Sequence, residues 1–177
     1  MKKFKTNKNA VSLAGEFAVL SQLALRNYDA NMTLGHTKGV DILVSKPGTK
    51  KMFRLEVKTK LRLNDQDVAK SEIFGTVVGG WIMNAKHERP YHDPSLFYCF
   101  VIIWKRTSKV RFFIVPSKVV SKYVKDEHTH WRNEKKKQGQ RVSHTDMRTF
   151  RVGFQNEKYS LETPTAEQYE NNWRFDK

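Results

Sequence analysis

Apolar and polar residues alternate along two neighbouring segments of the chain, residues 40–45 and residues 53–58. In each segment, every second residue is valine, isoleucine, leucine or phenylalanine. A period of two is typical of half-buried β-strands. Since the Pro47-Gly48 pair between the segments is typical of a turn, the pattern predicts a β-hairpin.

A different period precedes the hairpin, because apolar residues between Asn9 and Tyr28 recur at helical spacing. The predicted apolar stripe of this helix consists of Leu13, Leu20 and Leu23, widened by Ala14, Phe17 and Ala24. Glu16 falls within the stripe, and a carboxylate that faces a core is costly unless it is paired or bound to a metal ion. Glu16 therefore lies at the helix edge, pairs with an arginine, or belongs to a metal site.

The rest of the pattern completes an α/β arrangement. Residues 96–104 form a nearly continuous apolar run, which is typical of a strand covered on both faces. The other predicted elements are a short helix within 81–88, a strand over 110–115, a helix opened by Pro116-Ser117, a strand over 149–154 and a helix over 164–173. The order is helix, three strands, short helix, two strands and helix, which suits a mixed sheet between helices.

The hairpin brings two acidic residues together. If Gly48-Thr49 forms a two-residue loop, Asp41 pairs directly with Glu56, and their Cβ atoms lie about 5 Å apart. If a type II turn forms one residue earlier, Asp41 lies opposite Arg54, and Glu56 is diagonal to it at roughly 7–8 Å. Both carboxylates share one face of the hairpin in either register.

Like charges at this separation destabilise a hairpin unless something neutralises them. A hard cation with oxygen ligands would do so, and we expect Mg²⁺, with Mn²⁺ as a substitute. Lys58 follows Glu56 by two residues on the same face, so its ammonium can reach a metal-bound water or a scissile phosphate oxygen. The alternative is an ordinary surface hairpin whose charges are solvated.

The order and spacing of these residues resemble a known family. An early helix with Gly15-Glu16, followed by Gly39-Val40-Asp41 and then Glu56-Val57-Lys58, resembles the PD-(D/E)XK nuclease superfamily in its Holliday junction resolvase and restriction-endonuclease-like branch. The resemblance covers roughly residues 9–115, and Val40 stands where the family usually has proline before the first aspartate.

The resemblance implies a restriction-endonuclease-like αβββαβ core with a central mixed sheet flanked by helices. It also implies that Asp41 and Glu56 are metal ligands and that the carbonyl of Val57 is a third ligand. Lys58 would position or activate the attacking water, and Glu16 would be an accessory acid.

The charge of the chain agrees with a nucleic-acid partner. Lysine and arginine number 33 against 18 acidic residues, which gives a net charge of +15, and such a chain should bind polyanions with a marked salt dependence. Nucleic-acid contacts are expected from Lys38, Lys60, Arg62, Lys86, Arg132, Lys135, Lys136 and Lys137. Charge alone does not distinguish DNA from RNA or an acidic membrane surface.

Two of the segments expected to contact nucleic acid have alternative interpretations. The lysine run follows Trp131 in a predicted mobile basic loop, where Trp131 either stacks on a base or anchors the core. Lys86 and His87 either face the hairpin site or form an exposed helix end.

The length of 177 residues fits one domain. We expect a nuclease-like core over 1–127 and a basic C-terminal extension over 128–177 that packs on the same domain. The single Cys99 excludes an intramolecular disulfide and indicates a reducing compartment. Since no signal-peptide core or membrane-length apolar run is present, we expect a cytoplasmic protein without a membrane partner.

These observations favour a Mg²⁺-dependent endodeoxyribonuclease that hydrolyses phosphodiester bonds in duplex or branched DNA, in repair, recombination or restriction. One alternative is a non-catalytic nucleic-acid-binding protein on the same scaffold. Another is a subunit of a larger DNA-processing assembly. A homodimer would let two sites cut two strands, although the sequence encodes no recognisable interface.

Overall fold

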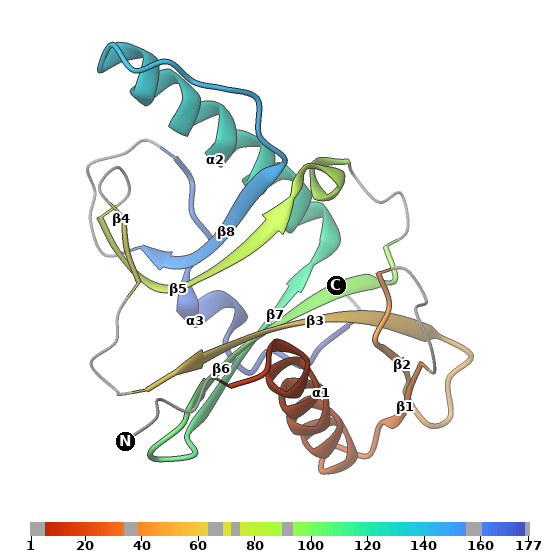
Figure 1. Ribbon diagram of the computed structural model, residues 1–177. Coiled ribbons are helices and arrows are strands. Elements are labelled where there is room, and N and C mark those ends of the chain that lie inside the picture. The colour runs from red at the N-terminus through yellow and green to blue at the C-terminus, as the bar shows by residue number, and fades with distance from the viewer. Residues whose placement is uncertain are drawn as a thin grey trace.

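The computed structural model describes residues 6–33, 39–63, 69–71, 75–89, 94–154 and 161–175. In chain order the elements are α1 (Lys8–Ala24), β1 (Asp29–Met32), β2 (Ile42–Ser45), β3 (Met52–Arg62), β4 (Ala69–Ser71), β5 (Gly75–Asn84), the 3-10 helix η1 (Ala85–Glu88), β6 (Leu96–Trp104), β7 (Val110–Pro116), α2 (Ser117–Lys137), β8 (Met147–Phe154) and α3 (Ala166–Tyr169) (Figure 1). The chain therefore has the mixed α/β content that the pattern predicted.

The central sheet contains five strands in the order β1-β2-β3-β6-β7. β3 and β6 are parallel, whereas the other neighbouring strands are antiparallel. This confirms the expected central mixed sheet. β6 spans the predicted residues and is buried along nearly its whole length, because its two faces are both covered by other layers.

The connection between the parallel strands differs from the prediction. A helix was expected within residues 81–88, but β5 continues to Asn84 and only the short η1 follows. Trp81 and Met83 are buried, while Ile82 and Asn84 are exposed, and this period of two is that of a strand. β5 pairs with β4 and β8 to form a second, three-stranded sheet, which the sequence did not predict.

The two faces of the central sheet form two separate cores. On one face, α1 and the C-terminal segment pack against the sheet through residues such as Val19, Leu23 and Trp173. On the other face, the second sheet and α2 pack against it through residues such as Trp81 and Phe150. Figure 1 shows α1 on one side of β3, with β5, β8 and α2 on the other.

The face of α1 that meets the sheet was predicted correctly only in part, since Leu20 and Leu23 of the expected stripe do pack into the core. Leu13 and Phe17 are 44% and 57% exposed, whereas Gly15, Val19 and Leu23 are buried. Gly15 lies against the side chain of Thr59 on β3, so the absence of a Cβ lets the helix backbone approach the strand closely. A pattern based on large apolar residues cannot detect this contact.

The C-terminal third is also more regular than predicted. α2 continues as one helix through the basic segment expected to be a loop, so that prediction is wrong, and the expected boundary at residues 127/128 falls inside this helix. α3 contains only four residues, with Thr165 as its N-cap. Trp173 and Phe175 complete one core. No helix within the described ranges is long and apolar enough to span a membrane.

The contact between Gly15 and Thr59 generates a stability prediction. Alanine has the higher helix propensity, by about 1 kcal/mol, but a Cβ at residue 15 would overlap the Thr59 side chain. We expect Gly15→Ala to lower the free energy of unfolding by about 1–3 kcal/mol in a urea titration. Ser21→Ala, at an exposed position of the same helix, should change it by about 0.5 kcal/mol or less. A stabilised Gly15→Ala variant would contradict the close approach.

Candidate active site

The register of the β2–β3 hairpin brings the two predicted acids close together at the end of the ladder. Ile42 pairs with Leu55 and Ser45 pairs with Met52. The ladder ends at Ile42, and the Asp41 amide donates to the Leu55 carbonyl, so Asp41 lies near Glu56 without forming a regular pair with it. The turn itself has Pro47-Gly48 at its centre, since the Thr49 amide donates to the Lys46 carbonyl at 3.1 Å and Gly48 has φ +77°.

The hairpin therefore combines features of both predicted alternatives. The register is the one expected for a two-residue loop, while the turn is the one expected for Pro47-Gly48. They coexist because the ladder ends at Ser45 and Met52, so a longer loop joins the two strands.

Asp41 is anchored where β2 meets the edge of β3. Its amide donates to the carbonyl of Leu55 at 2.8 Å, and its own carbonyl accepts from the Thr33 amide at 3.0 Å. The amide of Val57 donates to Oδ2 of the Asp41 carboxylate at 2.7 Å. Because the N–H and C=O groups of one strand residue point to the same side, the Val57 carbonyl also points toward Asp41.

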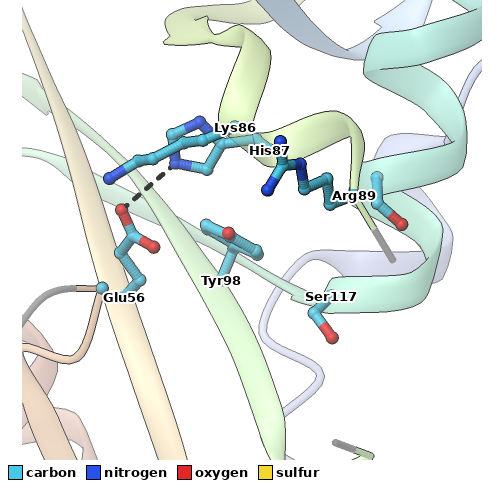
Figure 2. A pocket seen from close by; sticks show the side chains of 8 residues that line it. Glu56, Lys86, His87, Arg89, Tyr98 and Ser117 are labelled. Carbon is cyan, nitrogen blue, oxygen red and sulfur yellow. Dashed lines mark hydrogen bonds and ion pairs between the residues drawn. The ribbon is translucent and has the colours of Figure 1, made fainter. Parts of the chain in front are cut away.

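Glu56 is the most buried ionisable residue of the site, with 5% of its surface exposed. Its Oε1 atom lies 2.5 Å from Lys58 Nζ and 3.5 Å from His87 Nε2 (Figure 2). Its Oε2 atom faces Gly39, where a Cβ would lie 3.4 Å away. Within the described part of the chain, these contacts engage Oε1 of Glu56 and Oδ2 of Asp41 and leave the second oxygen of each carboxylate without a hydrogen bond.

The pKa values of the two carboxyl groups are shifted in opposite directions. Burial raises the pKa of Asp41; the Val57 hydrogen bond and the Lys58 charge offset this only in part, and the Glu56 charge adds to it. Burial also raises the pKa of Glu56, but the hydrogen bonds and charges of His87 and Lys58 outweigh it and bring the pKa to about 2. Glu56 is thus firmly ionised, whereas the surroundings of Asp41 favour its ionised form less than water does.

His87 faces the site, which was one of the two alternatives expected for it. It lies on η1 and is 7% exposed, and its ring packs edge-on against Tyr98. Nδ1 lies 3.2 Å from the Asn84 amide. When Nδ1 accepts that hydrogen bond, the ring proton is on Nε2, which then donates to Glu56. No signal in the sequence indicated this contact with Glu56, because the segment was predicted as part of a helix.

Lys58 lies between two shallow pockets on the β3 edge. One, of about 290 Å³, lies between β3 and β5 and includes Lys58, Lys60 and Ile82. The other, of about 480 Å³, lies between β3 and the start of α1 and includes Lys58 and Ser12. The Lys58 side chain is 30% exposed, so its ammonium is accessible from this edge while it contacts Glu56.

The remaining residues predicted near the site have different environments. Glu16 is partly buried and accepts a hydrogen bond from Ser12 at 3.1 Å. Lys60 donates to the carbonyl of Gly80 at 3.1 Å; burial, together with neighbouring Arg62 and Arg151, lowers its pKa. Lys38 lies outside the described residues.

Arg62 and Lys86 differ sharply in accessibility. Arg62 is buried, donates to the carbonyl of Val78 at 2.6 Å and lies over the Trp104 ring. Its guanidinium therefore ties β3 to β5. Lys86 is exposed and lies beside Glu56 in the wall of a third pocket.

The second basic cluster lies at the end of α2, which projects beyond the second sheet in Figure 1. Arg132, Lys136 and Lys137 are exposed and Lys135 is partly exposed. Trp131 stacks on His128 of the same helix, with ring centroids 5.6 Å apart. We call residues 132–137 the basic arm.

Two arginines that follow the basic arm along the chain have a different role. Arg148 pairs with Glu88, and Arg151 pairs with the buried Glu127. These ion pairs join β8 to η1 and α2, so they hold the second sheet in place and are not part of the basic arm.

No group of three or more histidine, cysteine or acidic side chains within the described ranges could hold a metal ion. The site instead offers two carboxylates and one main-chain carbonyl. All three are oxygen donors of the kind that Mg²⁺ prefers, and the glycine at residue 39 leaves space beside Oε2 of Glu56. The donor set therefore fits a small hard cation.

Comparison with known proteins gives a likeness of fold. No family model matches the chain, and no curated protein matches it. Among solved structures, the chain is similar to the bacterial homing endonuclease I-Ssp6803I, with a TM-score of 0.51 over 95% of this chain and 91% of that chain. The two share 13% sequence identity, so the chain has an endonuclease-like fold.

Proposed function

We propose that the protein is a Mg²⁺-dependent DNA endonuclease of the PD-(D/E)XK type. The observation that carries this proposal is the placement of Asp41 near Glu56, through the Val57 amide, with Lys58 against Glu56 on an accessible strand edge. Similarity in fold to a homing endonuclease over nearly the whole chain and a net charge of +15 support it. The proposal covers both duplex and branched DNA as substrates.

Asp41, Glu56 and the carbonyl of Val57 would hold the cation. A bound Mg²⁺ supplies Lewis-acid stabilisation of the phosphate charge and lowers the pKa of a water molecule. Asp41 is held by the Val57 amide, so one of its oxygens stays oriented toward the site. The raised pKa of Asp41 and its proximity to the Glu56 charge are the conditions that a cation would relieve.

Lys58 and His87 would organise the carboxylates. Lys58 contacts Glu56 at 2.5 Å and remains partly exposed, so its ammonium can orient the attacking water or bind a phosphate oxygen. His87 contacts the same carboxylate from η1 and fixes its rotamer. His87 would therefore be a positioning residue, because it acts through Glu56.

The basic arm would bind the DNA backbone away from the reaction centre. Its exposed lysines and arginine extend along one end of α2. Regular helical spacing holds these charges on a rigid element, and such contacts supply affinity without base specificity.

The first prediction separates metal binding from DNA binding. Asp41→Asn and Glu56→Gln should each lower Mg²⁺-dependent cleavage by about 10³-fold or more, while duplex affinity measured without metal changes by less than about threefold. Glu162→Gln, at an exposed acid, is the matched control and should cleave normally. Equal losses of cleavage and affinity in the two site variants would contradict a metal-holding role.

A second prediction concerns His87. His87→Ala should raise the Mg²⁺ concentration needed for half-maximal cleavage by about 10–100-fold, as removal of a partner that orients a metal ligand usually does. His87→Gln keeps an N–H donor and should restore part of this affinity. His144→Ala, at an exposed histidine, serves as control. An unchanged Mg²⁺ requirement in His87→Ala would show that the residue has only a packing role.

The basic arm generates a third prediction. Replacing Lys135, Lys136 and Lys137 with glutamine should reduce the slope of log affinity against log salt by about 0.9 for each phosphate that the arm no longer neutralises. The control replaces Lys105, Arg106 and Lys109, which lie in the turn between β6 and β7. An equal slope for wild type and the arm variant would show that the basic arm does not contact the DNA phosphates.

A further inference from the structure

A pocket of about 290 Å³ adjoins Glu56 (Figure 2). Glu56 lies at one end of it, and the first turns of α2 lie at the other. The residues that line it are Gly39, Glu56, Lys86, His87, Arg89, Tyr98, Ser117 and Ser121. The pocket thus extends from Glu56 past the aromatic ring of Tyr98 to the start of α2.

Two accessible, positively charged side chains line this pocket. Lys86 and Arg89 are both exposed, and both extend from the η1 region in Figure 2. Neither side chain forms an ion pair with any residue that the structure describes, in contrast to Arg148 and Arg151 nearby. Their charges are therefore available to a ligand in the pocket.

The opposite wall is polar and carries no acid. Ser117 and Ser121, in the first two turns of α2, line the pocket. The N-cap of α2 is Pro116, which provides no side-chain cap, and its first turn has no acidic residue. Among the described residues of the lining, Glu56 is the one acid, and its charge is balanced by Lys58 and by the hydrogen bond from His87. The lining as a whole favours an anion.

We propose that this pocket binds a phosphate group of the cleaved strand, next to the scissile phosphate. Arg89 and Lys86 would contact its oxygens, and Ser117 would donate a hydrogen bond from the opposite wall. This inference rests on the proposed nuclease function, because that function determines where the DNA strand would lie. The ligand would be a phosphate group with charged oxygens. It would come either from an internal phosphodiester or from a terminal phosphomonoester of the strand.

The test is an NMR titration of ¹⁵N-labelled protein without divalent metal, so that it does not depend on cleavage. The probes are thymidine dinucleotides: one with a 5′-phosphate, one with only the internal phosphodiester, and one with a neutral methylphosphonate linkage and no terminal phosphate. We expect saturable shifts of the Ser117 and Ser121 amides with a charged probe, and an affinity about tenfold lower in Arg89→Gln. Arg106→Gln, at an exposed arginine in the β6–β7 turn, should match wild type.

The probes also identify the source of the phosphate. Shifts with the internal phosphodiester alone would assign the pocket to a neighbouring phosphate within the strand, whereas a requirement for the 5′-phosphate would assign it to a strand end. Unmoved Ser117 and Ser121 amides, equal shifts with the neutral probe, or equal affinity in Arg89→Gln would overturn the proposal.

Cleavage assays on the same variants keep the two proposals apart. If the pocket binds the probes but wild type cuts no DNA with Mg²⁺, the nuclease proposal fails and the phosphate site stands. If wild type cuts and Asp41→Asn does not, yet Arg89→Gln cuts at the wild-type rate and binds the probes normally, the nuclease proposal stands and the phosphate site fails.

Discussion

The hydrogen bond from the Val57 amide to the Asp41 carboxylate joins the two halves of the proposed site. It forms beyond the end of the β2–β3 ladder, so it fixes Asp41 beside Glu56 without a further ladder pair between these strands. The rest of the fold supports this strand edge. On one face, Gly15 lets α1 pack closely against β3, and on the other, Lys60 and Arg62 bind carbonyl groups of β5. A displaced β3 would therefore separate Glu56 and Lys58 from Asp41 and His87.

The electrostatics of the site follow from burial and from the unequal distribution of partners. Glu56 has two, Lys58 and His87, and its pKa is about 2. Asp41 has one strong hydrogen bond and a neighbouring negative charge, and its pKa is raised. A cation shared by the two carboxylates would remove this imbalance. Since Oε1 of Glu56 and Oδ2 of Asp41 are engaged in hydrogen bonds and ion pairs, the protein sets the orientation in which the other oxygens face the site.

The sequence predicted the parts of this arrangement that depend on period and spacing. The alternation along the hairpin placed Asp41, Glu56 and Lys58 on one face, and the apolar run at residues 96–104 predicted β6 with its correct bounds. Contacts across the molecule were not predictable in the same way. The packing of α1 depends on the small size of Gly15. The end of β5, residues 81–84, was predicted as helix because its strand partner, β8, lies far along the chain. His87 reaches Glu56 from η1, which follows that strand.

The central claim is that Asp41 and Glu56 together hold a divalent cation. The most direct measurement is an electron paramagnetic resonance titration of Mn²⁺ into the protein in the presence of duplex DNA, repeated with Asp41→Asn, Glu56→Gln and the control Glu162→Gln. Saturable Mn²⁺ binding to wild type and control, and its absence in both site variants, is the predicted result. Equal Mn²⁺ binding by all four proteins, or no binding by wild type, would contradict the claim.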